Sequence, residues 1–508
     1  MELVYLWVES YKNIEKQGFN FSPRFRCEYD ENTKELNILD KEETGEFYPK
    51  NFFGDNINVT AIVGENGSGK SSLISLFMEI IYSKVTNNYI LVFNNGYSSN
   101  IENISTSLNK MENITKEILY NIVFDFSLGD GYILNQKNED YKKNYSLEPS
   151  RNYYSGSMGG ISKIENQSYN ATMYANAIYF FRYFDTSIIK YLKLPLFNKL
   201  KYISITKIGN IHKEKAVLQI IKKSSEVFKN DLLDGILEEN IQQNMSRIIQ
   251  TLTEKVKNLT FEDFFDKDYL LIQEDILLLF KFKFIDDNNL DFTLLSKGQQ
   301  QIISYFGILA RLKRNFADKN NINIFFDEVE STFHPDWQRN FINLLIQLIV
   351  KSNLLNNGQK INLVFATHSP FILSDLPKEN IIFLEKGKQV YPFEDGKQTF
   401  GANIHTLLSH GFFMKDGLMG EFAKDKIQLI IKYHEDIEKK EIIEADKIEY
   451  KTKKQKEFWQ IQSIIGDDYL KQVIKNHLIE IEKIVLGNHE AKEEEIKRLK
   501  AQIELLEK

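Results

Sequence analysis

The sequence predicts an α/β fold with a parallel sheet, a helical insertion and a helical C-terminal extension. Two observations support this fold class. An apolar, β-branched run, Ile57–Val63, ends in a glycine-rich loop that is followed by a helical pattern over Ser71–Tyr82. Two more apolar runs, Asn323–Phe326 and Asn362–Ala366, are separated by helical segments. Apolar strands that alternate with helices are typical of a parallel sheet that is buried on both faces.

Shorter patterns predict the remaining elements. Leu3–Val8 is an apolar run typical of a strand, and strand-like pieces such as Ile118–Phe126 occur in a polar stretch between about 87 and 170. From about 213 to 264, charged and apolar residues alternate at helical spacing, which predicts two or three amphipathic helices that are too short for a long coiled-coil arm. Tyr269–Phe284 is strongly apolar, and after about 424 the chain is rich in lysine and glutamate.

Length and composition limit the class of protein. A chain of 508 residues is expected to form two to four units at about 150 residues each. Hydrophobic residues make up 42% of the chain and aromatic residues 13%, which excludes disorder as the dominant state. The net charge of -7 gives no overall attraction to nucleic acid or to an anionic membrane, although a local basic groove could still bind DNA.

The cysteine count and the N-terminus favour a cytoplasmic location. Cys27 is the only cysteine, so an intrachain disulfide and a cysteine-based zinc cluster are excluded. Met1–Ser10 lacks the basic-then-apolar order of a signal peptide. No window reaches about 18 uninterrupted apolar residues, so we expect no membrane span.

The glycine-rich loop carries the strongest chemical signal. Residues 64–71 fit the pattern G-x-x-x-x-G-K-[ST] of P-loop NTPases, with a strand before the loop and a helix after it. Glycines let backbone N–H groups point at phosphate oxygens, while the lysine reaches the β- and γ-phosphates and the serine hydroxyl holds Mg²⁺. The pattern therefore predicts ATP and Mg²⁺ as ligands, bound by Gly64, Asn66, Gly67, Ser68, Gly69, Lys70, Ser71 and Ser72.

Two adjacent carboxylates follow the strand at 322–326. Asp327 stands at the strand end, where a Mg²⁺-binding acid is expected beside a phosphate loop. Glu328 comes one residue later and is the predicted general base that activates the attacking water. Together with Lys70, these residues predict a catalytic site for ATP hydrolysis.

Two further motifs carry a resemblance to ABC-type ATPases. Leu295-Ser296-Lys297-Gly298-Gln299 opens an apolar helix with Ser296 at the N-cap, and it is similar to the L-S-x-G-Q signature of that family. Ala366-Thr367-His368-Ser369-Pro370 resembles the family's switch-histidine segment. The resemblance implies that His368 contacts the γ-phosphate, and that Ser296, Gly298 and Gln299 cap an ATP held by a second chain. It therefore implies a homodimer or a higher homo-oligomer.

Within that family, the chain looks most like the RecF/SMC-like class. The run from Asp327 to Pro335 is similar to the D-E-x-E-x-x-x-H-P pattern of that class. The resemblance implies an ABC-ATPase head formed by residues 1–205 and 269–424, divided by a helical insertion at 206–268 and followed by a helical interaction region at 425–508. It does not place the family's Q-loop glutamine, which we expect near Phe180–Asp185.

The segment Thr399–Ile427 resembles the tails of stand-alone ATPases of prokaryotic antiviral systems such as Septu, PARIS and retrons. This resemblance implies an ATPase that senses infection and controls a separate effector, a nuclease or toxin. A RecF/SMC-like role in DNA repair or DNA clamping is the alternative, with DNA as a ligand. A fused nuclease is disfavoured, because the tail offers only Asp467-Asp468 in a helical context and no nuclease signature.

The last helical pattern leaves two interpretations open. Ile496, Leu499, Ile503 and Leu506 repeat at a 3-4-3 spacing over two heptads. Such a helix either docks one face on its own domain or binds a partner.

Overall fold

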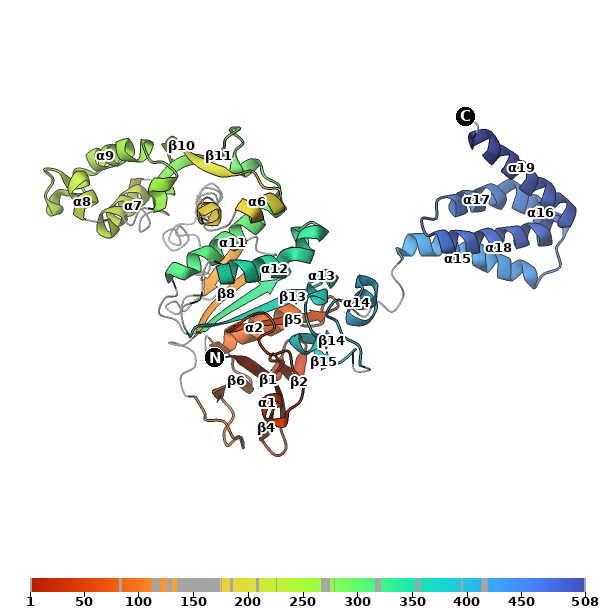
Figure 1. The fold of residues 1–508 in the computed structure, drawn as a ribbon, viewed down its shortest axis with the longest axis horizontal. Coiled ribbons are helices and arrows are strands. Elements are labelled where there is room, and N and C mark those ends of the chain that lie inside the picture. Colours follow the sequence, from red (N-terminus) through yellow and green to blue (C-terminus); the bar gives the residue numbers. More distant parts are fainter. Residues whose placement is uncertain are drawn as a thin grey trace. The chain divides into compact units, whose positions relative to one another are not determined.

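The chain folds into two compact units, Met1–Met414 and Lys415–Lys508 (Figure 1). The computed structural model describes residues 2–81, 85–111, 119–125, 130–134, 174, 176–182, 186–206, 210–224, 226–265, 275–277, 279–315, 321–351, 355, 358–393, 396–412 and 419–506. Much of the polar stretch predicted between 87 and 170 lies outside these residues. The domain limits inferred from the sequence stay predictions.

A seven-stranded sheet forms the centre of the first unit, in the order β15-β14-β5-β13-β12-β8-β9. The five inner strands are parallel to one another, and the two edge strands are antiparallel to their neighbours. The strands are β5 (Ile57–Gly64), β8 (Leu119–Asp125), β9 (Asp130–Leu134), β12 (Asn321–Asp327), β13 (Lys360–Thr367), β14 (Ile381–Glu385) and β15 (Lys388–Val390). The predicted α/β fold with a parallel sheet is confirmed.

Helices cover both faces of this sheet (Figure 1). On one face, Phe325 of β12 packs against Phe77 of α2 (Lys70–Ile81), with ring centroids 4.9 Å apart. On the other face, Phe326 packs against Phe341 of α12 (Pro335–Lys351), which stacks on Phe306 of α11 (Lys297–Asn315). Successive side chains of a strand point to opposite faces, so an uninterrupted apolar run serves both layers.

The N-terminal strands form a separate antiparallel lobe rather than part of the central sheet. Its main sheet has the order β2-β1-β6-β7, and β3 and β4 make a hairpin beside it. The elements are β1 (Leu3–Tyr11), β2 (Ile14–Asn20), β3 (Phe25–Asp30), β4 (Glu35–Asp40), α1 (Lys41–Thr44), β6 (Tyr89–Phe93) and β7 (Gly96–Ser99).

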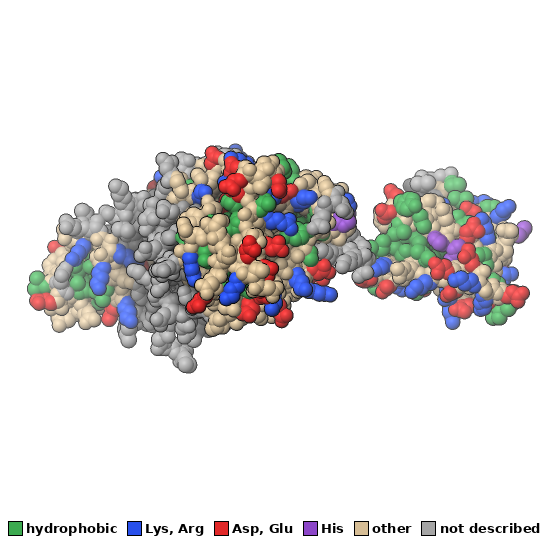
Figure 2. Space-filling model, turned by 90° about the horizontal axis from the view of Figure 1, so that it is seen from below, with side chains coloured by type: hydrophobic (Ala, Val, Ile, Leu, Met, Phe, Trp, Pro, Cys, Tyr) green, Lys and Arg blue, Asp and Glu red, His purple; other side chains and the backbone are tan. Residues whose placement is uncertain are grey.

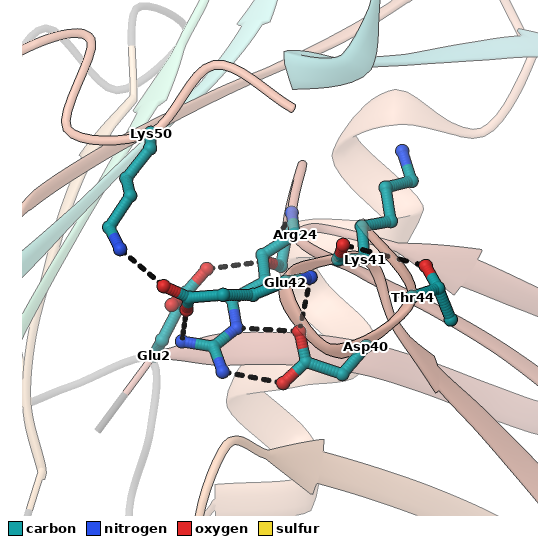
Figure 3. A network of polar contacts seen from close by, with 8 residues as sticks. Glu2, Arg24, Asp40, Lys41, Glu42, Thr44 and Lys50 are labelled. Atoms are coloured by element: carbon teal, nitrogen blue, oxygen red, sulfur yellow. Dashed lines mark hydrogen bonds and ion pairs between the residues drawn. The ribbon is translucent and has the colours of Figure 1, made fainter. Parts of the chain in front are cut away.

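Charged side chains tie α1 to the segments around it (Figure 3). Arg24 donates two hydrogen bonds to Asp40, at 2.8 Å and 2.5 Å, and forms an ion pair with Glu42 at 2.6 Å. Lys50 also pairs with Glu42. Because the contact between Arg24 and Asp40 is bidentate, it fixes the direction in which the chain enters α1.

The described residues from 186 to 286 combine helices with a two-stranded antiparallel ribbon, whose strands lie outside the limits 206–268 predicted for the insertion. β10 (Phe197–Ile205) pairs with β11 (Phe280–Asp286), and Phe284 of β11 stacks on Phe261 at 5.6 Å. Phe180 and Phe181 are buried in the same core, whereas residues 183–185 of the segment expected near the Q-loop lie outside the described residues. The helices are α6 (Thr186–Tyr191), α7 (Asn210–Lys223), α8 (Glu226–Leu233), η2 (Glu238–Asn240), α9 (Met245–Lys257) and η3 (Glu262–Phe265).

Short elements complete the first unit: η4 (Phe292–Leu294), η5 (Val329–Thr332), α13 (Pro370–Ser374), η6 (Lys378–Asn380) and α14 (Ile404–Gly411). In the described parts of both units, no helix is long and apolar enough to span a membrane.

The second unit is a helical bundle with its own core. It consists of α15 (Glu421–Glu438), α16 (Glu444–Glu449), the π-helical turn η7 (Tyr450–Lys454), α17 (Gln455–Ser463), α18 (Asp468–Leu486) and α19 (Asn488–Leu506). Tyr450 and Phe458 are buried at its centre. Of the predicted heptad residues, Ile496, Leu499 and Ile503 are about half exposed, at 52%, 48% and 55%.

A buried carboxylate holds three elements of the bundle together. The side chain of Glu482 on α18 is 1% exposed and accepts two hydrogen bonds from Arg498 of α19, at 2.8 Å and 2.5 Å. Gln455 and Trp459 of α17 donate to the same carboxylate, each at 2.9 Å. The carboxylate is fully satisfied only while all three helices are docked.

We predict that Arg498→Met destabilises the bundle by about 3 kcal/mol, because it leaves a buried carboxylate without its cation. Amides of α18 should then exchange with deuterium about a hundredfold faster in hydrogen-exchange mass spectrometry. The double variant Glu482→Leu/Arg498→Met should recover most of the protection, and Lys497→Met serves as the exposed control. Equal exchange in the single and double variants would contradict the assignment.

Candidate functional site

The phosphate-binding loop connects the carboxyl end of β5 to the first turn of α2. Gly67 and Gly69 have φ values of 77° and 112°, which a residue with a side chain rarely adopts. A Cβ atom on Gly64 would lie 2.3 Å from the Leu384 carbonyl oxygen, so glycine is required there for close packing. Ser68 Oγ is buried and has no hydrogen-bond partner. The loop is a polar cradle with at least one unsatisfied group.

Lys70 lies across this cradle. Its Nζ atom donates to the carbonyl oxygens of Gly64 and Glu65, at 3.1 Å and 3.2 Å. Burial lowers the pKa of Lys70, while the nearby Glu328 and Asp327 carboxylates act in the opposite direction. These carboxylates face the ammonium from the end of β12.

The parallel register brings the predicted acids and the histidine to the same edge. Asp327 of β12 lies opposite Ala366 of β13, which in turn lies opposite Ile62 of β5. Ser71 Oγ donates to Asp327 Oδ1 at 3.1 Å. A serine hydroxyl, one carboxylate and phosphate oxygens are the hard oxygen ligands that Mg²⁺ prefers.

Glu328 and His368 meet beside the loop. Glu328 has a φ of 50°, and its N–H donates to the Ala366 carbonyl oxygen at 2.9 Å. This left-handed backbone, uncommon for a residue with a side chain, turns the chain out of the strand. His368 Nε2 lies 3.3 Å from Glu328 Oε1, although without hydrogen-bond geometry. Burial, followed by the charge of Lys70, lowers the pKa of His368. The lowered pKa favours the neutral imidazole.

A second carboxylate lies beneath this pair. Glu330 is 4% exposed and accepts hydrogen bonds from Thr367 Oγ1 and, at 3.3 Å, from the His368 N–H. Burial raises the pKa of Glu330 to about 7. Ser369 donates from Oγ to Gln338 at 2.8 Å, and Gln338 Nε2 donates to the Glu330 carbonyl oxygen at 3.3 Å. These bonds join the residues after β12 to the switch segment after β13.

The signature segment forms the capped start of α11. Ser296 Oγ accepts from the Gln299 N–H at 3.3 Å, and Gln299 Oε1 accepts from the Ser296 N–H at 2.9 Å, a reciprocal capping box. A Cβ atom on Gly298 would lie 2.7 Å from the Thr332 carbonyl oxygen. Among the described residues, the partners of Ser296, Gly298 and Gln299 in these contacts all lie outside the phosphate-binding loop.

Two hairpin turns contact the loop without any signal in the sequence. Asn13 Nδ2 donates to the Gly67 carbonyl oxygen at 2.9 Å, and the Gly387 N–H donates to the Ser68 carbonyl oxygen at 2.9 Å. The two turns also touch each other, since a Cβ atom on Gly387 would lie 2.1 Å from the Asn13 carbonyl oxygen. No local motif marks either residue, because each acts through its position in the fold.

Comparison with known families identifies the head. Residues 59–374, well over half of the chain, match the family described as "AAA domain, putative AbiEii toxin, Type IV TA system". The chain belongs to this family. The matched range runs from β5 through the phosphate-binding loop and the switch histidine to the end of α13. The chain is an ATP hydrolase, as the motifs predicted.

Two relatives come from retrons. The chain is 21% identical to the "Retron Vc95 probable ATPase" of Vibrio cholerae serotype O1 biovar El Tor over 428 residues, which cover 75% of this chain and 79% of that protein. It is 26% identical to the "Retron Ec83 probable ATPase" of Escherichia coli over 137 residues, 25% of this chain and 23% of that protein. The predicted resemblance to retron-associated ATPases is confirmed.

We predict that Glu330→Gln changes the pH dependence of stability in the nucleotide-free protein. An unfolded glutamate ionises near 4.5, whereas burial raises the pKa of Glu330 to about 7 in the folded chain. Its contribution to stability is therefore fully present below about pH 4.5 and is lost as the pH rises through 7.

As the pH rises from 5 to 8, the free energy of unfolding of the variant should increase by about 2 kcal/mol relative to that of wild type. The neutral amide can still accept a hydrogen bond from Thr367, and it avoids burying a charge. Urea unfolding at both pH values measures this difference. Glu43→Gln on the exposed α1 is the control. A constant difference between the variant and wild type would show that Glu330 does not titrate in this range.

Proposed function

We propose that the residues gathered at the carboxyl edge of the sheet bind and hydrolyse ATP between two copies of the chain. Backbone N–H groups of the loop and the Lys70 ammonium hold the phosphates. Ser71 and Asp327 hold Mg²⁺, which neutralises charge on the phosphates. The cradle fits this role, because the glycine geometry admits phosphate oxygens close to the backbone and Ser68 Oγ needs a partner.

Glu328 is the proposed general base. It lies past the strand end, with its Oε1 atom 3.3 Å from His368 Nε2, where it would accept the proton of a water that attacks the γ-phosphate and displaces ADP. His368 would contact the γ-phosphate as a neutral donor. Glu330 holds the His368 backbone in place and is thus a positioning residue.

The signature segment carries the argument for two copies. Ser296 and Gln299 bond to each other, and Gly298 lies against Thr332 rather than the loop of its own chain. The exposed start of α11 could then cap the γ-phosphate of an ATP that a facing copy holds, as the resemblance to ABC-type ATPases implies. Thr332 belongs to η5, directly after Glu328, so each signature segment contacts the turn that follows its own chain's base. The two composite sites would therefore be coupled.

We further propose that this cycle operates in antiphage defence, where ATP-dependent assembly controls a separate effector, a nuclease or toxin. The retron-associated relatives support this context. A RecF/SMC-like role on DNA is the alternative. On the face drawn in Figure 2, acidic and basic side chains are interspersed over the head rather than gathered in a basic stripe. A hydrolysis rate that rises with added DNA would favour the alternative.

We predict that Glu328→Gln retains ATP and accumulates a dimer or a larger assembly. Loss of the base should slow hydrolysis by at least about a hundredfold while leaving the phosphate contacts intact. Size-exclusion chromatography with light scattering measures the assembly, and phosphate release measures the rate. The double variant Lys70→Ala/Glu328→Gln should stay unassembled, because it cannot hold the phosphates. Hydrolysis at the wild-type rate in the single variant would exclude Glu328 as the base.

We predict that Ser296→Arg abolishes hydrolysis but leaves ATP binding to the single chain unchanged. A long cationic side chain at the exposed start of α11 should block the approach of the facing copy. It should leave the phosphate-binding loop of its own chain unchanged. Equilibrium dialysis with labelled ATP measures binding, and phosphate release measures turnover. Ser107→Arg, an exposed serine on the N-terminal lobe, is the matched control. Loss of ATP binding in Ser296→Arg would mean that the signature acts within its own chain.

A further inference from the structure

A second cleft lies in the head beside the N-terminal lobe. It has a volume of about 290 Å³, at the lower end of the range for small-molecule sites. Its walls come from β3 and the segment before it, α1, η6, β14 and β15. The residues that the argument uses are Arg26, Lys41, Lys378, Glu379, Gln389 and Tyr391.

This cleft is separate from the phosphate-binding loop. Glu379 and Ile381 stand at the amino end of β14, which runs parallel to β5. Leu384, at the other end of β14, pairs with Gly64 of the loop. Three residues of strand span about 10 Å, so the Glu379 side of the cleft lies toward the opposite end of β14 from the proposed ATP site, whereas Gln389 lies beside Leu384.

Cations outnumber acids in the cleft. Lys41 is partly buried and Arg26 is exposed, and neither has a carboxylate within ion-pair distance among the described residues. Figure 3 shows the Lys41 side chain turned away from the neighbouring charged network of Arg24. Burial lowers the pKa of Lys41, and Glu379 acts in the opposite direction. Lys378 Nζ, by contrast, donates to the Phe393 carbonyl oxygen at 2.8 Å. The two unpaired cations would attract an anion.

The single carboxylate is incompletely bonded. Glu379 Oε1 accepts from Gln398 at 3.2 Å, whereas Oε2 is buried without a hydrogen-bond partner. A buried carboxylate oxygen left in this state costs free energy, which a donor on a ligand would recover. The cleft therefore offers anion binding and acceptance of a hydrogen bond in one small volume.

Aromatic rings complete the lining. The Arg26 guanidinium lies 5.1 Å from the centroid of the Tyr391 ring, and Phe383 and Phe393 also face the cleft. A guanidinium beside an aromatic ring is a surface on which a flat heterocycle can stack.

We propose that this cleft binds a nucleoside monophosphate, with its phosphate on Lys41 and Arg26 and an N–H donor of its base on the Glu379 carboxylate. No single base is favoured, because each of the common bases carries an N–H donor. The phosphate supplies the negative charge and the base supplies both the donor and the flat ring.

The cleft is connected to the catalytic loop through one hairpin. β14 and β15 form its wall, and the Gly387 N–H in their turn donates to the Ser68 carbonyl oxygen at 2.9 Å. Gln389 of the same hairpin accepts from the Asn20 N–H at 3.2 Å, which joins the hairpin to the lobe that carries Asn13. A bound nucleotide would thus act on the conformation of the loop. This regulation depends on ATP hydrolysis, whereas binding in the cleft does not.

Isothermal titration calorimetry tests the binding directly. The full chain is loaded with Mg²⁺ and a non-hydrolysable ATP analogue, freed of excess analogue and titrated with AMP, GMP, CMP, UMP or inorganic phosphate. At least one monophosphate should bind, with Lys41→Ala and Glu379→Gln each weakening it at least about tenfold. Lys388→Ala, an exposed lysine of β15 outside the cleft, should bind as wild type.

Three results would overturn the proposal. They are the absence of binding by every monophosphate at millimolar concentration, binding that is unchanged in both cleft variants, and binding of phosphate as tight as that of the nucleotides. If Lys41→Ala does not fold, Arg26→Ala replaces it, because that side chain is exposed. Because the readout is binding to a preloaded chain, failure here is distinct from failure of the Glu328 and Ser296 predictions.

Discussion

The parallel register of β5, β13 and β12 is the constraint on which the candidate site depends. It places Ile62, Ala366 and Asp327 side by side, so the chain leaves three buried strands at a common edge. Lysine, two acids and a histidine that are separated by up to about 300 positions in the sequence then meet around one loop. A shift of one residue in the register would turn each strand's side chains to the opposite face. The apolar layers on both faces of the sheet therefore fix the chemistry as well as the fold.

Beneath this edge, buried polar bonds connect segments that would otherwise move independently. Glu330 accepts from Thr367 and from the His368 backbone, and Gln338 ties the same turn to Ser369. In a low-dielectric interior these bonds are costly to break singly, so the turn after Glu328 and the switch segment are expected to move together. Gly298 touches Thr332 at the end of the same turn. Glu328, His368 and Gly298 are thus linked within one chain through the residues of η5.

On the other side of the loop, the contacts come from turns rather than motifs. Asn13 and Gly387 hold the backbone of Gly67 and Ser68, and the hairpin that carries Gly387 also lines the second cleft. The loop region therefore contacts both Asp327 at the end of β12 and the turns that carry Asn13 and Gly387. If the cleft binds a nucleotide as proposed, this hairpin would connect the ligand to the phosphate-binding loop.

The sequence by itself determined the α/β class, the phosphate-binding loop and the acids at a strand end. These signals are local, because strand burial, glycine geometry and helix capping act within about ten residues. Only the tertiary structure decided that Leu3–Tyr11 belongs to an antiparallel lobe, that Glu330 is buried under His368, and that Asn13 and Gly387 support the loop. It also brought Lys41 and Glu379 into one cleft. Such contacts join residues far apart in the chain, and packing energy rather than local conformational preference selects them.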